Sequence, residues 1–134
     1  MENTENTFFP LASFKALVAH HIALIERFSE PELAEFSLLF LKMDDYENIE
    51  IKKSIQIVFR DSDIIFEYEG NYIILLPKTD WNGANELLNG LQEFLDQKLC
   101  DSIVTYPDDG TDAVTLLESF KNVVKKYYHI DLKL

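Results

Sequence analysis

Apolar residues recur along the chain with two different periods, and each period predicts a kind of element. Over residues 10–28 they are spaced three and four positions apart, as on one face of a helix. Pro10 suits the first turn of that helix, because a proline there lacks only an N–H that would be unpaired anyway. Residues 36–43 are almost continuously apolar and flanked by charge, which predicts a strand buried on both faces. Helical spacing returns over residues 45–59.

The middle of the chain predicts a β-hairpin. Two runs rich in Ile, Phe and Tyr, residues 62–68 and 72–77, are joined by the short link Glu69-Gly70-Asn71. Glycine and asparagine both tolerate a positive φ, so we expect the link to form a tight turn.

The remaining third of the chain predicts two helices and two strands. Asp80 is expected to cap a helix that runs to Leu95, residues 102–106 form a strand, and residues 107–110 form a turn. Thr111 or Asp112 is expected to cap the last helix, which faces the core through Leu116, Leu117, Phe120, Val124 and Tyr127. Residues 129–134 alternate apolar and charged side chains, as an edge strand does.

The order of elements predicts an α/β (α+β) fold. Strand, helix, strand, strand, helix, strand is the βαββαβ unit of ferredoxin-like or palm folds, which places four antiparallel strands under two helices. An N-terminal helix precedes this unit, and a C-terminal helix and strand follow it. We expect one domain over residues 7–134, after a flexible N-terminus at residues 1–6. Such a fold carries many unrelated functions, so individual residues must indicate the activity.

Composition narrows the setting of the protein. The net charge of −12, from 24 acidic and 12 basic residues, disfavours both nucleic acid and anionic membranes as partners. We interpret Lys52-Lys53 and the lysines at 121, 125 and 126 as solvated helix faces. No apolar run approaches the length of a membrane span. The single cysteine, Cys100, cannot form an internal disulfide, so we expect a cytoplasmic protein.

Three stretches of the chain, in order and spacing, resemble the GGDEF family of bacterial diguanylate cyclases. Residues 36–46 (FSLLFLKMDDY) stand in place of an apolar strand that ends in D-x-D-x-F. Residues 60–63 (RDSD) resemble R-x-x-D, and residues 68–77 (YEGNYIILLP) resemble the signature hairpin with its LLP strand. Residues 102–110 (SIVTYPDDG) are similar to S-I-G-x-A-x-Y-P-x-D-G. The resemblance implies the same palm-like fold and a role in bacterial signalling.

The resemblance also implies where a cyclase would hold its metals. Members of the family join two GTP molecules into cyclic di-GMP with two divalent ions, held by the first Asp of D-x-D and by an acid in the signature turn. In this chain Lys42 occupies the first of those positions, and Asp44 lies two residues further on. A fixed ammonium about 4 Å from a divalent ion is repelled by roughly 8 kcal/mol at an effective dielectric constant of 20.

The signature turn is one residue shorter than in the family. Glu69, Gly70, Asn71 and Tyr72 stand in its place and keep one of the paired glycines that let the backbone approach a phosphate. No acid occupies the catalytic position unless the hairpin is realigned to use Glu69. We therefore expect no cyclase activity, no catalytic residues, no metal and no other cofactor.

Arg60 and Asp63 match the family's inhibitory site, where an Arg and an Asp bind the product cyclic di-GMP. The planar guanidinium of Arg60 suits this role, because it donates to phosphate and to a guanine edge at once. As an alternative, Arg60 and Asp63 pair with each other, or cap the helix end and the strand start.

Two hypotheses for the function follow. The leading one is a catalytically inactive, GGDEF-like regulatory or interaction module that binds a protein partner or forms a homodimer. The second is a cyclic di-GMP receptor that uses Arg60 and Asp63. An acidic cluster, Asp44, Asp45 and Glu47, is either a metal site or a solvated loop or helix N-terminus.

Overall fold

The computed structural model describes residues 8–28, 35–43, 53, 55, 57–60, 62–95 and 102–134. Its elements in chain order are β1 (Phe8–Phe9), the 3₁₀ turn η1 (Leu11–Ser13), α1 (Phe14–Phe28), β2 (Phe36–Leu41), β3 (Ile64–Tyr68), β4 (Asn71–Pro77), α3 (Trp81–Leu95), β5 (Ile103–Tyr106) and α4 (Ala113–Tyr128). Residues 53, 55, 57 and 58 are also helical, but most of the helix expected over residues 45–59 lies outside the described residues. So do the N-terminus at residues 1–6, Cys100 and the acidic cluster.

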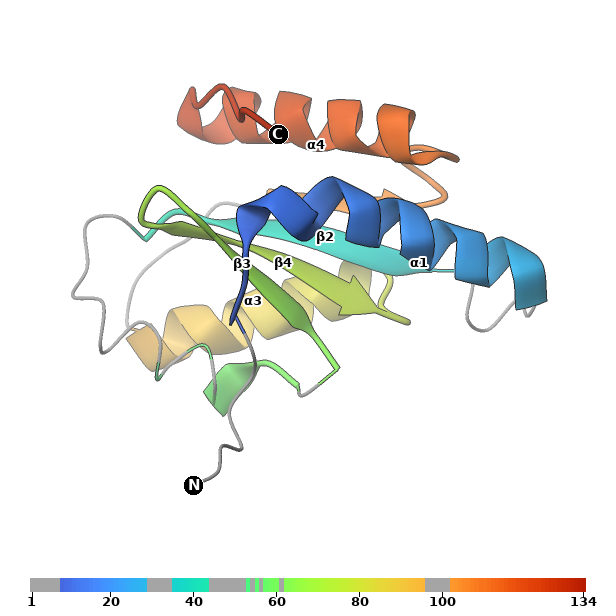
Figure 1. Cartoon of the computed structure of the whole chain (residues 1–134). Coiled ribbons are helices and arrows are strands. Elements are labelled where there is room, and N and C mark those ends of the chain that lie inside the picture. Colours follow the sequence, from blue (N-terminus) through green and yellow to red (C-terminus); the bar gives the residue numbers. More distant parts are fainter. Residues whose placement is uncertain are drawn as a thin grey trace.

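The strands form one five-stranded sheet in the order β1-β3-β4-β2-β5. The four strands β3, β4, β2 and β5 are antiparallel neighbours, as predicted for a palm-like unit. β1 was not predicted and pairs with β3 in parallel, so β1 and β5 are the two sheet edges. Helices α1 and α4 cover one face of the sheet and α3 covers the other (Figure 1). The predicted α+β architecture is confirmed.

Strand β2 lies inside the sheet, between β4 and β5, and all six of its residues are buried. Alternate side chains enter two separate cores, as a pleated strand requires. Leu38 and Phe40 pack with α1 and α4, whereas Leu39 and Leu41 pack with α3. The continuous apolar run at residues 36–43 is therefore a strand buried on both faces, as predicted.

The core beneath α1 and α4 is built around aromatic rings. The ring of Phe14 meets Phe66 edge-on at 4.9 Å and lies 6.2 Å from the ring of Phe120. The prediction for α4 was wrong at Tyr127, which is 42% exposed. Tyr128 packs against this core instead, 5.7 Å from the ring of Phe40, because it continues the i, i+4 row of Phe120 and Val124.

The C-terminal residues 129–134 were predicted to form an edge strand, and that prediction was wrong. His129 caps α4 with a left-handed backbone (φ 59°), so the chain turns there and no strand forms. Lys133 N–H donates to the Tyr68 hydroxyl at 2.9 Å, and Leu132 is buried in the core below. The alternating pattern indicates only that one side of the segment is buried. An irregular segment packed on a core produces the same pattern as an edge strand.

Short-range contacts of carboxylates define the starts of α3 and α4. Asp80 accepts the Gly83 N–H at 2.8 Å at the start of α3, as predicted. Asp112, rather than Thr111, caps α4 by accepting the Thr115 N–H at 2.8 Å. Both contacts satisfy N–H groups that a helix start would otherwise leave without an acceptor.

The turn after β5 folds back on the strand. Asp109 accepts the Thr105 N–H through its side chain at 2.8 Å and donates its own N–H to the Thr105 carbonyl at 2.8 Å.

In the part of the chain that the structure describes, no helix combines the length and hydrophobicity needed to cross a bilayer.

Candidate functional site

Arg60 and Asp63 lie against each other where the chain enters β3. The Asp63 carboxylate accepts the Arg60 backbone N–H at 2.8 Å, its Nη2 at 2.8 Å and its Nε at 3.2 Å. The Asp63 side chain is fully buried, whereas the Arg60 side chain is 46% exposed. The three-residue spacing makes this possible, because Asp63 N–H also donates to the Arg60 carbonyl at 3.0 Å and closes a turn. The sequence alternative in which the two residues pair is therefore what the structure contains.

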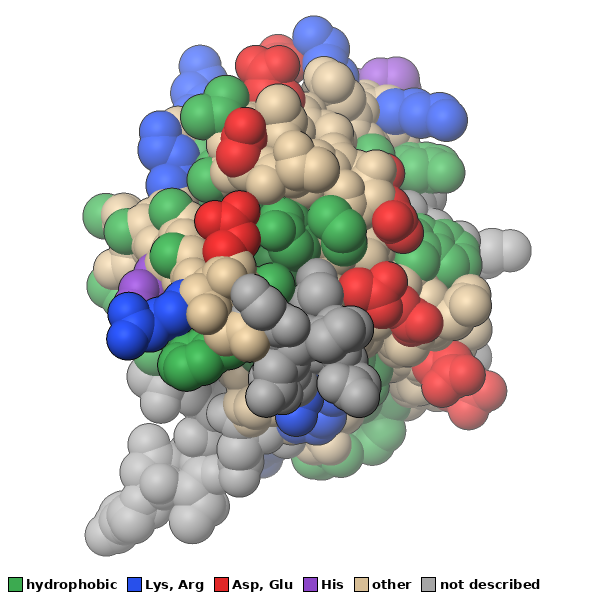
Figure 2. All heavy atoms as spheres, turned by 90° about the vertical axis from the view of Figure 1, so that its right-hand side faces the viewer, with side chains coloured by type: hydrophobic (Ala, Val, Ile, Leu, Met, Phe, Trp, Pro, Cys, Tyr) green, Lys and Arg blue, Asp and Glu red, His purple; other side chains and the backbone are tan. Residues whose placement is uncertain are grey.

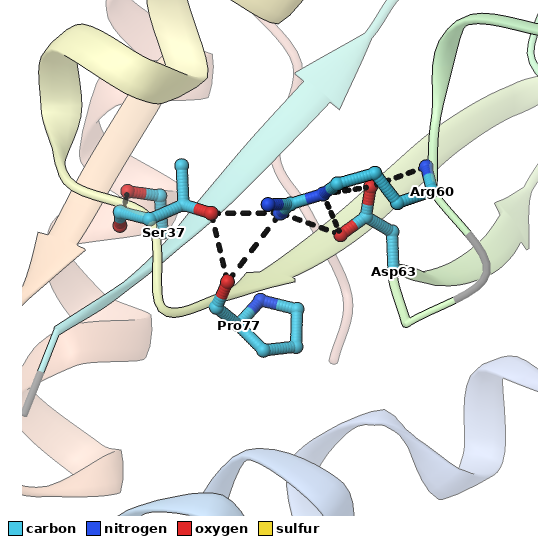
Figure 3. Close-up of polar contacts among 5 residues, drawn as sticks. Ser37, Arg60, Asp63 and Pro77 are labelled. Carbon is cyan, nitrogen blue, oxygen red and sulfur yellow. Dashed lines mark hydrogen bonds and ion pairs between the residues drawn. The ribbon is translucent and has the colours of Figure 1, made fainter. Parts of the chain in front are cut away.

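The guanidinium also ties this turn to the end of β4. Nη2 of Arg60 donates to Thr79 Oγ1 at 2.7 Å and to the Pro77 carbonyl at 3.4 Å. The Thr79 hydroxyl donates to the same Pro77 carbonyl at 2.8 Å, and the Ser37 hydroxyl donates to the Thr79 carbonyl at 2.8 Å. Figure 3 shows the Arg60 side chain lying between Asp63 and the Pro77 carbonyl. The cluster joins β2, β3 and β4 at one end of the sheet.

A pocket of about 540 Å³ opens beside this cluster. It is lined by Glu35, Arg60, Lys78, Thr79, Asp80, Gly83, Glu86 and Leu87. Two of these side chains are cationic and three are carboxylates, so the wall offers both signs of charge within one concave surface. The buried Asp63 is not part of the wall, and only Arg60 of the predicted pair faces a ligand placed there.

The hairpin lies at the other end of β3 and β4. Its turn contains only Glu69 (φ 48°) and Gly70 (φ 85°), both in left-handed conformations, and Tyr68 pairs with Asn71 across it. This is the type of two-residue turn that matches the twist of the flanking strands. The predicted tight turn is confirmed, with Asn71 as the first residue of β4 rather than part of the link.

Two of the residues that stand in place of the signature turn point inward. Asn71 is 3% exposed, and its side-chain oxygen accepts the Met43 N–H at 2.7 Å. Tyr72 is 2% exposed and belongs to the core under α3. Lys42 is half-buried immediately after β2, next to this hairpin, and Asp44 lies outside the described residues. Among the residues the structure describes, no three His, Cys, Asp or Glu side chains are grouped to hold a metal ion.

The predicted site residues therefore form two separate groups. The seven residues of β4 separate the hairpin turn from Lys78 and Thr79, which places the two groups about 20 Å apart. Sequence reasoning missed Thr79 and Ser37 in the Arg60 group. A polar residue just before the capping Asp80 was the available signal for Thr79. Nothing in the sequence pointed to Ser37.

A group of three rings, with half-buried His21 at one end, lies where α1 meets the sheet. His21 meets the Phe36 ring edge-on at 4.7 Å, and Phe36 stacks on Tyr106 at 5.2 Å. Burial, followed by the nearby His20, lowers the pKa of His21. Burial, followed by the charge of Glu26, raises the pKa of Tyr106. Both shifts favour the neutral form of the side chain.

Comparison with known proteins places the fold. No family model and no curated protein matches the chain. Among solved structures, the chain is similar to a sensory box/GGDEF family protein from Caulobacter crescentus CB15. The TM-score is 0.67 at 16% sequence identity, over 94% of this chain and 99% of that chain. The chain thus has a GGDEF-like, palm-type fold, and at this identity the likeness extends to the fold alone.

Proposed function

We propose that this chain is a GGDEF-like domain without cyclase activity, which acts as a regulatory module in bacterial signalling by binding a protein partner. The fold likeness supports a GGDEF-like domain. The residues at the positions where the family binds metal and phosphate support the lack of cyclase activity.

The observation that carries the proposal is the hairpin turn. A cyclase turn must bring backbone N–H groups and an acid to a phosphate and a metal. Here Glu69 and Gly70 form a minimal turn, and the Asn71 side chain is committed to the Met43 N–H. Lys42 adds a cation beside the same turn. These features favour a role for this end of the sheet in folding rather than in chemistry.

Two measurements test the proposal. Incubation of the full chain with GTP and Mg²⁺ or Mn²⁺, followed by chromatography of the nucleotides, should show no cyclic di-GMP. Formation of that product, lost in Glu69→Gln, would overturn the inactive assignment. Crosslinking in cells of the source organism should trap the chain in a complex. Recovery of only a free monomer would contradict the interaction role.

A cyclic di-GMP receptor is the second candidate, and the half-exposed guanidinium of Arg60 at the pocket is the observation that favours it. Glu35, Asp80 and Glu86 in the same wall oppose it, because they repel phosphate. Calorimetry with about 100 μM cyclic di-GMP tests this candidate. The melting temperature is a second readout, because a ligand that binds only the folded state raises it. Binding that is lost in Arg60→Ala and weakened in Lys78→Ala would support the receptor. Absence of heat, or heat unchanged in Arg60→Ala, would remove it.

A further inference from the structure

Helices α1 and α4 lie side by side over one face of the sheet (Figure 1). A groove of about 420 Å³ lies between them. It is lined by Lys15, Ala16, Ala19, Ala113, Val114, Leu117, Glu118 and Lys121. Leu117 is buried beneath the groove, whereas Val114 on its rim is 72% exposed. The groove is therefore an apolar surface with charged residues along its rim.

The outer side of α1 extends this surface. No residue from 16 to 25 is charged, although 27% of the whole chain is. Ala16, Ala19 and Ala23 are exposed on the side opposite to the buried Phe14 and Val18. A helix that borders solvent normally carries several charged residues on that side. Between Lys15 and Glu26 the outer side of α1 has one exposed polar residue, His20, among the alanines. This small polar share suits a helix with a neighbour on part of its outer side.

The charge of this layer differs in sign from that of the chain. The residues of α1, α4 and the C-terminal segment, 14–28 and 113–134, include six basic and three acidic residues, whereas the whole chain has 12 and 24. In Figure 2 most of the visible Lys and Arg side chains lie along the upper and left-hand parts, on the side of α4 and α1. Lys15 and Lys121 come from opposite walls of the groove, and Lys15 Nζ also donates to the Leu134 carbonyl at 3.4 Å. An acidic occupant is favoured here and is disfavoured over the rest of the surface.

We propose that this groove docks an amphipathic helix of a partner protein, with an apolar face flanked on both sides by Asp or Glu. The inference rests on the proposed function and names the face and the chemistry of the partner. The α4 wall spans residues 113–121, about 12 Å of helix, so two to three turns of the partner fit. The alanines of α1 permit a close approach of that helix, and Val114 and Leu117 contact its apolar face.

Charge also decides against two other occupants. A basic helix would meet Lys15 and Lys121 with like charge and would gain one counter-charge, Glu118. A second copy of this chain that presented the same face would bring the two excesses of positive charge together. A second copy that presents another, acidic face is a separate outcome, which the experiment below distinguishes.

Site-specific photocrosslinking of the full chain in cells of the source organism tests the proposal. Val114 is replaced by photoreactive benzoylphenylalanine, and Phe94 is the matched control, because it is 53% exposed on α3, on the other face of the sheet. The captured peptide is sequenced by mass spectrometry. We expect capture from Val114 and not from Phe94, and a peptide with apolar residues at helical spacing flanked by acids.

Two further variants in the Val114 background separate charge from shape. Lys15→Glu with Lys121→Glu should lower the crosslink yield about tenfold, because two attractions become repulsions. Ala19→Phe should lower it by filling the groove while the charge stays unchanged. Equal melting temperatures of both variants and the parent establish that folding is intact.

The proposal fails if Val114 captures nothing, captures another copy of this chain, captures a peptide without acidic flanks, or captures equally well after both changes. If Phe94 captures a partner and Val114 does not, the groove is wrong and the interaction role stands. If neither position captures a protein and general crosslinking finds only a monomer, both fail.

Discussion

Replacing Asp63 by alanine should destabilise the fold by about 3 kcal/mol. The Asp63 carboxylate is fully buried and accepts two short hydrogen bonds of 2.8 Å, from the backbone and from Nη2 of Arg60. A hydrogen bond to a charged group contributes about 1.5–3 kcal/mol, and the half-exposed guanidinium argues for the lower end of that range. Two such bonds give the total, and the longer Nε contacts are left out of it.

The assay is thermal unfolding followed by circular dichroism. An unfolding entropy of about 2.1 cal/mol/K per residue gives about 0.28 kcal/mol/K for 134 residues. The Asp63→Ala variant should therefore melt about 10 °C below the natural chain. Asp63→Asn keeps one acceptor oxygen and should lose about half as much.

The exposed Asp108, in the turn after β5, supplies the control. Asp108→Ala should change the free energy of unfolding by less than about 0.5 kcal/mol, because it removes a carboxylate at the surface. Melting of Asp63→Ala within about 2 °C of the natural chain would refute the structural assignment of the pair. An equal loss in Asp108→Ala would show that a general effect of charge, rather than the Arg60 contacts, is responsible.

Three other predictions concern packing and pH. Gly110→Ala should lower the free energy of unfolding in chemical denaturation by about 2 kcal/mol or more, because the added Cβ would lie 2.5 Å from a backbone nitrogen of α4. Gly90→Ala, in open space on α3, should raise it by about 0.5–1 kcal/mol. The backbone N–H that Asp112 accepts lowers its pKa, so its stabilising effect is complete above the ordinary value of 3.8 and is lost as the pH falls through the lowered value; Asp112→Asn should flatten that acid dependence in thermal melts. Burial lowers the pKa of His21, so the unfolded chain binds the proton first and the melting temperature should fall as the pH drops below 6.5. His21→Gln should remove this effect. His129→Gln, at an exposed position, should retain it.

Elements with a long face against the core were predictable from the sequence. All six residues of β2 are buried. α1 shows one helical period along the face that holds Phe14, Val18 and Ile22, although its last residue, Phe28, is 61% exposed. β1 has only two residues, Phe8–Phe9, which is too short to show a period, and its partner β3 lies more than fifty residues away. Residues 129–134 show the period of a strand without its hydrogen bonds. The left-handed His129 decided their path, and a non-glycine residue carries no clear signal for that conformation.

In the candidate site, contacts between residues close in sequence were predictable, whereas contacts set by strand pairing were not. Arg60 and Asp63 are three residues apart, so their pairing could be proposed from the sequence. Ser37 and Thr79 are forty-two residues apart and meet because Ser37 lies opposite Leu76 in the register of β2 and β4. That register is a property of the assembled sheet. The inward turn of Asn71 likewise depends on where the chain leaves β2.

The turn after β5 has a consequence for how this protein avoids sticking to itself. β5 is an outer strand, and an outer strand normally presents unpaired N–H and C=O groups on which another chain can add a strand. At Thr105 both groups are already bonded, the N–H to the Asp109 carboxylate and the carbonyl to the Asp109 N–H, so one residue substitutes for a neighbouring strand. The carboxylate also places a negative charge beside the edge of a chain whose copies all carry −12. A strand added at Thr105 would have to break both of these bonds, so the turn hinders growth of the sheet from one molecule into the next at this point of the edge.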